Sequence, residues 1–148
     1  MARIERAARF NAPVSEVFDF IADFRTLKEY NPSILCVTPL TLGPPQKGSR
    51  FELTLSMFRR KIRPVLTITE FRRPELITTR LDAFFPAGEE RVFRADEAGN
   101  TLFFFTIDFA SGWPLVGPMV DLALAKGFAE PQADTEIRML RRRYAFDR

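Results

Sequence analysis

The chain has 148 residues, a formal net charge of +3 and hydrophobic residues at 46% of its positions, which suits one domain with a sizeable core. It contains no histidine, which excludes the commonest general base, the Ser–His and Cys–His nucleophile pairs and the commonest metal ligand. The single cysteine, Cys36, excludes an internal disulfide and a multi-cysteine zinc site. We therefore expect neither a metal nor a cofactor, and acid–base chemistry would fall to carboxylates, Tyr or Lys.

The first residues and the most apolar stretches of the chain bear on its cellular location. Residues 1–6 lack the apolar core of a signal peptide. The two most apolar stretches, 102–110 and 115–125, each contain a carboxylate and are too short to span a bilayer. We expect a cytoplasmic protein without a transmembrane segment.

The first third of the chain predicts one strand and two short helices. Residues 2–10 alternate between apolar and charged side chains, as a half-buried strand does. Pro13 suits the first position of a helix, which continues with an apolar stripe through Ile21. A second helix is expected at 25–30, ending before Asn31 because the residue that precedes a proline avoids the helical region.

The middle of the chain predicts strands joined by short turns, and such turns imply antiparallel neighbours. Polar and proline-rich segments at 43–48, 59–61, 72–75, 84–88 and 96–100 read as the loop and turns. The strands are expected at 34–38, 51–57, from about Pro64 to Phe71, 76–82, 89–95 and 101–110. In the last of these, every other residue is apolar and should face inward.

The last third, from Trp113 to Tyr144, predicts a long amphipathic helix. Pro131 interrupts it and should produce a kink, or two helices that meet there. The whole chain, 1–148, then reads as one α+β domain in which an antiparallel meander carries its helices on one side.

Several segments in this order resemble the START-like helix-grip (SRPBCC) superfamily of polyketide cyclase/dehydrase and lipid-transport-like proteins. The resemblance covers nearly the whole chain, and its carriers are Ala12-Pro13 with Val17 and Phe18, Tyr30-Asn31-Pro32, Gly43 with Gly48, Gly99-Asn100-Thr101 and the long closing helix. It implies a seven-stranded curved antiparallel sheet around a long C-terminal helix, with two short N-terminal helices. It also implies a mostly apolar cavity between sheet and helix for lipids, polyketides, quinones or similar molecules.

Inward-facing side chains of the expected sheet and helix are the candidate ligand-binding residues. Ordinary core packing is the alternative interpretation for the strand positions among them. The candidates are Phe51, Leu53, Leu55, Thr67, Thr79, Phe103, Phe105, Ile107 and Phe109 on strands, and Met119, Leu122, Phe128 and Leu140 on the helix. Trp113 and Tyr30 are candidates for the mouth of the cavity.

Polar residues inside such a cavity would orient a ligand or carry chemistry. Glu70 and Asp108 are the candidate catalytic carboxylates, because burial raises the pKa of a carboxyl and suits it to acid–base work. Exposure to water is the alternative for both Asp108 and Asp121, and the alternation of the strand supports it for Asp108. Arg80, Asp121 and Tyr144 are further polar candidates.

Three hypotheses for function follow. The first is binding or carriage of a hydrophobic small molecule without strong evidence of catalysis. The second is a cofactor-free polyketide cyclase/dehydrase that uses a cavity carboxylate. The third is a ribosome, RNA or protein interaction module that uses basic clusters at 59–63, 72–73 and 138–143, although we favour charged turns and a solvated helix face as the explanation of these clusters. We favour the first, do not expect nucleic-acid binding, and leave a homodimer open.

Overall fold

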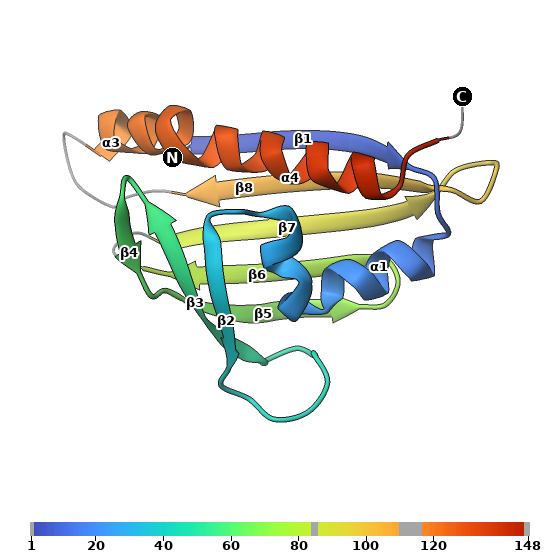
Figure 1. Ribbon diagram of the computed structural model, residues 1–148, viewed down its shortest axis with the longest axis horizontal. Helices are drawn as coiled ribbons and strands as arrows, with labels where there is room; N and C mark the ends of the chain where they lie inside the picture. Colours follow the sequence, from blue (N-terminus) through green and yellow to red (C-terminus); the bar gives the residue numbers. More distant parts are fainter. Residues whose placement is uncertain (1, 84–85, 110–116, 147–148) are drawn as a thin grey trace.

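One curved antiparallel sheet and a long C-terminal helix make up most of the molecule (Figure 1). The computed structural model describes residues 2–83, 86–109 and 117–146. Its strands are β1 (Ala2–Phe10), β2 (Ile34–Pro39), β3 (Arg50–Met57), β4 (Arg60–Ile62), β5 (Val65–Arg72), β6 (Leu76–Asp82), β7 (Pro86–Ala95) and β8 (Thr101–Phe109). Seven of them follow the order β1-β8-β7-β6-β5-β3-β2, and the short β4 pairs with β3.

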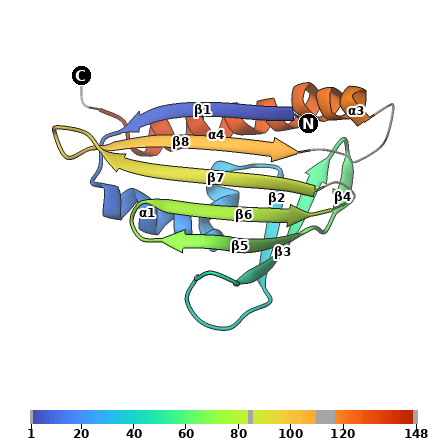
Figure 2. The same ribbon diagram turned by 180° about the vertical axis from the view of Figure 1, so that it is seen from behind.

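The helices lie on one face of this sheet, as the view from behind shows (Figure 2). They are α1 (Val14–Ala22), α2 (Leu27–Tyr30), α3 (Gly117–Leu124) and α4 (Glu130–Arg143), with a 3₁₀ turn at Phe24–Thr26 before α2. The helix-grip α+β fold expected from the sequence is therefore confirmed, including its seven-stranded main sheet.

Two turns differ from the sequence expectation. The β3–β4 hairpin turns at Phe58 and Arg59, which both have positive φ, so that Arg60 and Lys61 already pair with β3. The turn had been expected at 59–61. Strand β7 begins at Pro86, inside the turn expected at 84–88, because a proline is tolerated at the first position of a strand. Residues 84 and 85 lie outside the described residues, as do Ala110 and Trp113.

The C-terminal helix contains a π-helical turn, Ala125–Ala129, between α3 and α4. Pro131 lies in the first turn of α4, where its missing backbone donor costs little. The predicted meeting of two helical segments near Pro131 is thus seen, with the π-turn as the joint.

This π-turn changes which face of α3 points inward. An extra residue in a helix rotates the following face by about 100°, since 3.6 residues make one turn. Met119 and Leu122 share a face with Ala133 and Leu140 only in an uninterrupted helix. They are instead 73% and 58% exposed, while Asp121 and Leu124 are buried. The expectation that Met119 and Leu122 cover the sheet is wrong for this reason.

Phenylalanine fills the interior at one end of the sheet. The ring of Phe103 lies 5.4 Å from that of Phe10 and 5.3 Å from that of Phe93, and all three side chains are almost completely buried. The expected inward face of β8, with Phe103, Phe105, Ile107 and Phe109, is buried throughout.

The two ends of the chain are joined to one another. Strand β1 pairs along its whole length with β8, from Ala2 opposite Phe109 to Phe10 opposite Thr101. Just beyond β1, the backbone N–H of Asn11 donates to the carbonyl oxygen of Tyr144 at 2.9 Å. The side chain of Asn11 donates to the carbonyl oxygen of Ala145 at 3.1 Å.

Candidate functional site

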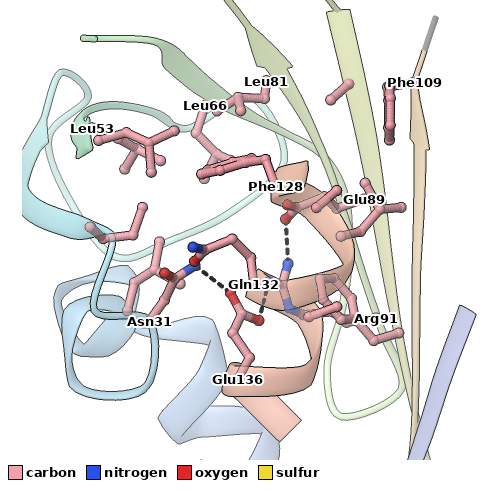
Figure 3. A pocket seen from close by; sticks show the side chains of 18 of the residues that line it. Asn31, Leu53, Leu66, Leu81, Glu89, Arg91, Phe109, Phe128, Gln132 and Glu136 are labelled. Carbon is pink, nitrogen blue, oxygen red and sulfur yellow. Dashed lines mark hydrogen bonds and ion pairs between the residues drawn. The ribbon is translucent and has the colours of Figure 1, made fainter. Parts of the chain in front are cut away.

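A pocket of about 80 Å³ lies between the sheet and the C-terminal helix (Figure 3). Apolar side chains from β3, β5, β6, β8 and the C-terminal helix form most of its wall, among them Leu53, Leu66, Leu81, Phe109 and Phe128. Polar side chains from α4, β7 and the end of α2 form the rest of the wall. This combination of apolar wall and a few convergent polar side chains is typical of small-molecule sites.

A buried cluster of charges forms the polar side of the pocket. Alternation along β7 directs Glu89 and Arg91 to the same face as the core residue Phe93. Arg91 Nη1 donates to Glu89 at 2.9 Å and Nη2 donates to Glu136 at 3.4 Å. The Arg91 guanidinium also lies 4.4 Å from the centre of the Phe105 ring. The Arg91 guanidinium therefore pairs with the carboxylates of Glu89 and Glu136 and also contacts the Phe105 ring.

Amide side chains extend this cluster toward α2. Asn31 Nδ2 donates to Glu136 Oε1 at 2.8 Å, and Asn31 Oδ1 accepts from the backbone N–H of Ser33 at 3.1 Å. One turn before Glu136, Gln132 Nε2 donates to the Ser33 hydroxyl. Gln132 Oε1 is buried and has no hydrogen-bond partner among the described residues. Figure 3 shows Asn31, Gln132, Glu136 and Arg91 side by side on one wall.

Burial determines the protonation of these groups. Desolvation is the main cause that raises the pKa of Glu136 to about 7; nearby Glu89 acts in the same direction, and Arg91 and Asn31 oppose the change. Burial also disfavours the charge of Arg91, but Glu89 and Glu136 outweigh it and raise the pKa of that guanidinium. A carboxyl with a pKa close to neutral, in a largely dry pocket, is able to donate or accept a proton.

The structure brings only part of the sequence-predicted set to the pocket. Six of the predicted residues line it: Leu53, Leu55, Phe105, Ile107, Phe109 and Phe128. Phe51, Thr79, Phe103 and Leu140 are buried outside the lining. Thr67 is half-buried on the face of β5 opposite Leu66, and Met119 and Leu122 face solvent.

Neither predicted catalytic carboxylate lies in the pocket. Asp108 alternates with the inward residues of β8 and forms an ion pair with Arg3 at 2.7 Å on the outer face. Glu70 forms an ion pair with Lys47 at 3.1 Å and has a half-exposed side chain. The carboxylates that line the pocket are Glu89 and Glu136.

The other polar candidates also lie outside the lining. Arg80 pairs with Asp82 at the surface, and Asp121 is a buried residue of α3 itself. Tyr144 packs against Phe10, and Tyr30 is buried with its hydroxyl unpartnered among the described residues. Burial raises the pKa of Tyr30 well above its usual value.

Sequence reasoning did not select Asn31, Glu89, Arg91, Gln132 or Glu136 as site residues, although the patterns contain the signal. Glu89 and Arg91 precede Phe93 at the spacing of two that defines one face of a strand. Glu136 falls between Ala133 and Leu140 on the apolar stripe of the helix. A charged residue at an inward position is the feature that identifies each of them.

The basic clusters do not gather at one place. The cluster at 59–63 lies at the β3–β4 hairpin, and that at 72–73 lies at the opposite end of the sheet, after β5 (Figure 1). Arg73 forms an ion pair with Asp19 at 2.8 Å, and Arg143, at the end of α4, covers the Phe20 ring at 3.8 Å. Arg73 and Arg143 thus each make a contact within the fold itself.

Residues 2–83, 86–109 and 117–146 contain no group of three or more Cys, Asp or Glu side chains arranged to hold a metal ion. Within the same ranges, no helix combines the length and apolarity needed to cross a membrane.

Comparison with known proteins places this geometry in context. A family model described as polyketide cyclase / dehydrase and lipid transport matches residues 1–145. Among curated proteins, no sequence matches the chain.

Solved structures of similar fold come from several organisms. A START superfamily protein from Mycobacterium smegmatis is 18% identical, with a TM-score of 0.74 over 95% of this chain and 97% of that chain. The Zhui aromatase/cyclase from a Streptomyces species is 16% identical, with a TM-score of 0.79 over 97% and 96% of the two chains. A major latex-like protein from Panax ginseng is 8% identical, with a TM-score of 0.74 over 98% of each chain. At these identities the likeness shows the fold alone.

Proposed function

Because the chain belongs to the polyketide cyclase/dehydrase and lipid-transport family, we propose that it binds a hydrophobic small molecule between the sheet and the C-terminal helix. The observation that carries this proposal is the pocket itself. Its wall is mainly apolar, and its few polar groups are gathered on one side. A ligand would bury its apolar body against Leu53, Leu66 and Phe109 and turn a polar end toward Gln132.

The volume of the pocket limits what enters without rearrangement. About 80 Å³ is below the ~150 Å³ of an apolar cavity that holds benzene, and far below the roughly 300–1,000 Å³ of sites for drug-sized ligands. Even a single ring therefore requires the pocket to widen somewhat, and a sterol or a polyketide requires it to widen much further.

The π-turn is where we expect widening to occur. Phe128 lies on it, lines the pocket and is only partly buried. Its ring centre is 6.1 Å from that of Phe58, at the exposed tip of the β3–β4 hairpin. Displacing these two rings would open the pocket toward solvent without disturbing the Phe-filled end of the sheet.

A pocket-filling variant tests the binding function. Ala129→Phe adds a ring at the pocket wall, and Ala98→Phe adds the same ring at the exposed β7–β8 turn as a matched control. We expect native mass spectrometry of protein purified from its own cells to show a bound hydrophobic mass in the unaltered chain and the control, and to lose it in Ala129→Phe. The affinity for an environment-sensitive apolar dye should fall at least about tenfold in the same variant. Equal dye binding by Ala129→Phe and the control would contradict the proposal.

Acid–base catalysis is a second candidate, favoured by one observation. Glu136 is buried at the pocket wall with a pKa raised to about 7, mainly by desolvation. In a dehydration, its protonated carboxyl would give a proton to a departing hydroxyl, which leaves as water. The carboxylate would then take up the proton released from the neighbouring carbon as the double bond forms.

Matched carboxylate variants separate this candidate from simple binding. If the pocket is catalytic, Glu136→Gln should abolish turnover of a β-hydroxyketone substrate analogue while dye binding remains. Asp108→Asn, on the outer face, should leave both unchanged. Turnover that survives in Glu136→Gln would remove the enzyme hypothesis for this carboxylate.

A further inference from the structure

The polar side of the pocket has an uneven balance of hydrogen-bond donors and acceptors. The side-chain amide of Asn31 donates to Glu136, and Arg91 donates to both Glu89 and Glu136. The amide nitrogen of Gln132 donates to Ser33. These three side chains thus direct four nitrogen atoms at protein acceptors.

One acceptor on the same wall remains without a donor. Gln132 Oε1 is buried and accepts no hydrogen bond from the part of the chain that the structure describes. Buried polar atoms nearly always have a partner, so an orphan at a pocket wall indicates a group supplied from outside the chain.

The charged side chains of this wall are also already paired with one another. The pocket is lined by two carboxylates, Glu89 and Glu136, and by one guanidinium, Arg91. That guanidinium pairs with both carboxylates, and the Phe105 ring covers it at 4.4 Å. Among the described lining residues there is no second cation for an anionic ligand. A carboxylate that entered would face the carboxyl groups of Glu89 and Glu136, with Arg91 already paired to both.

We propose that the pocket selects an uncharged hydrophobic molecule whose polar end is a hydrogen-bond donor, such as a phenol or an alcohol, with Gln132 Oε1 as the acceptor. This inference rests on the binding function proposed above and specifies the class of its ligand. A phenol hydroxyl fills the vacant hydrogen bond of Gln132, whereas an ether leaves that buried acceptor unsatisfied. An acid anion, such as the head of a fatty acid, is disfavoured by Glu89 and Glu136.

Four probes that share one methyl-substituted ring test the inference by varying the group opposite the methyl. They are p-cresol, 4-methylanisole, 4-methylbenzoate and toluene, whose single ring requires the least widening of the pocket. Titration of the full chain, followed by NMR shifts of backbone and glutamine side-chain amides, gives the four dissociation constants. We expect p-cresol to bind about tenfold or more tightly than toluene and 4-methylanisole, because only p-cresol satisfies the buried acceptor. We expect 4-methylbenzoate to bind most weakly.

A glutamine variant locates the preference. Gln132→Leu keeps a side chain of similar size and removes the acceptor, so p-cresol should fall to the affinity of toluene while toluene is unchanged. Gln46→Leu changes the only other glutamine of the chain, which is exposed in the β2–β3 loop, and should have no effect.

The outcomes separate the two proposals. If none of the four probes binds, the proposed binding function fails and the ligand class fails with it. If toluene binds but p-cresol binds no better, the ligand class is overturned while the binding function stands. Equal binding of 4-methylanisole and p-cresol overturns it as well, as does a p-cresol preference that survives in Gln132→Leu. Should Gln132→Leu fail to fold, the probe series on the unaltered chain already decides.

Discussion

Replacing Glu136 by Gln should remove a pH dependence of stability that the unaltered protein shows between about pH 4.5 and pH 7. Glu136 is buried beside Arg91 and Glu89, and desolvation raises its pKa from 4.5 to about 7 in the folded state. In this interval the folded protein retains a proton that the unfolded chain has released. Stability is therefore greatest below the unfolded pKa and falls as pH rises through the folded one.

The size of this effect follows from the change in pKa. A difference of one pKa unit corresponds to about 1.4 kcal/mol, so the change from 4.5 to about 7 corresponds to a loss of about 3 kcal/mol across the interval. A glutamine does not ionise and shows no such loss. Its amide also places a donor toward Arg91, which adds a constant offset. The slope against pH is therefore the diagnostic quantity.

Urea unfolding from about pH 4.5 to about pH 8 measures that slope in both proteins. The difference in unfolding free energy between Glu136→Gln and the unaltered chain should rise by about 3 kcal/mol, in favour of the variant, as pH increases. Glu29→Gln, at an exposed position of α2, is the control and should follow the unaltered chain. Parallel curves for Glu136→Gln and the unaltered chain would refute the account of a buried, largely protonated carboxyl.

Two further changes test the charge cluster and the core. Arg91→Leu should destabilise the fold by roughly 3–5 kcal/mol in urea, because it leaves Glu89 and Glu136 buried without their cation, whereas Arg80→Leu breaks only an exposed pair and should change little. Equal effects would show that the cluster is not a buried ion network. Phe103→Ala should destabilise by about 3–5 kcal/mol, because it empties the contacts with Phe10 and Phe93. Phe104→Ala, on the opposite face and 41% exposed, should lose less than about 1 kcal/mol, and a similar loss at both positions would contradict the inward assignment of Phe103.

Local patterns in the sequence predicted most of the fold. The alternation in residues 2–10 and 101–109 identified the strands and their inward faces, since one face of each is buried and the pleat has a period of two. The prolines and glycines located the turns to within a few residues.

The phase of α3 could not be predicted in the same way. Helical periodicity assumes 3.6 residues per turn throughout, and the π-turn at 125–129 breaks that assumption without a distinctive composition. Met119 and Leu122 were placed inward for that reason. The correct face contains Asp121, which a polarity argument assigns to solvent.

The site was predicted only in its apolar half. Leu53, Phe105 and Phe109 follow from alternation, but alternation does not reveal which inward positions leave space between them. Phe103 and Phe109 lie on the same face of β8, yet only Phe109 lines the pocket, because the rings of Phe10 and Phe93 fill the space beside Phe103. Glu136 and Arg91 were not predicted as site residues, because nothing in a single sequence shows that they neutralise each other.

The pairing of β1 with β8 and the bonds from Asn11 to Tyr144 and Ala145 have a consequence for biosynthesis. Strand β1 finds its hydrogen-bonding neighbour β8 only after about a hundred more residues have been translated, and contacts so distant along the chain slow folding. Until then its alternating apolar edge is unprotected and prone to association with other chains. The sheet can therefore be completed only after β8 has left the ribosome.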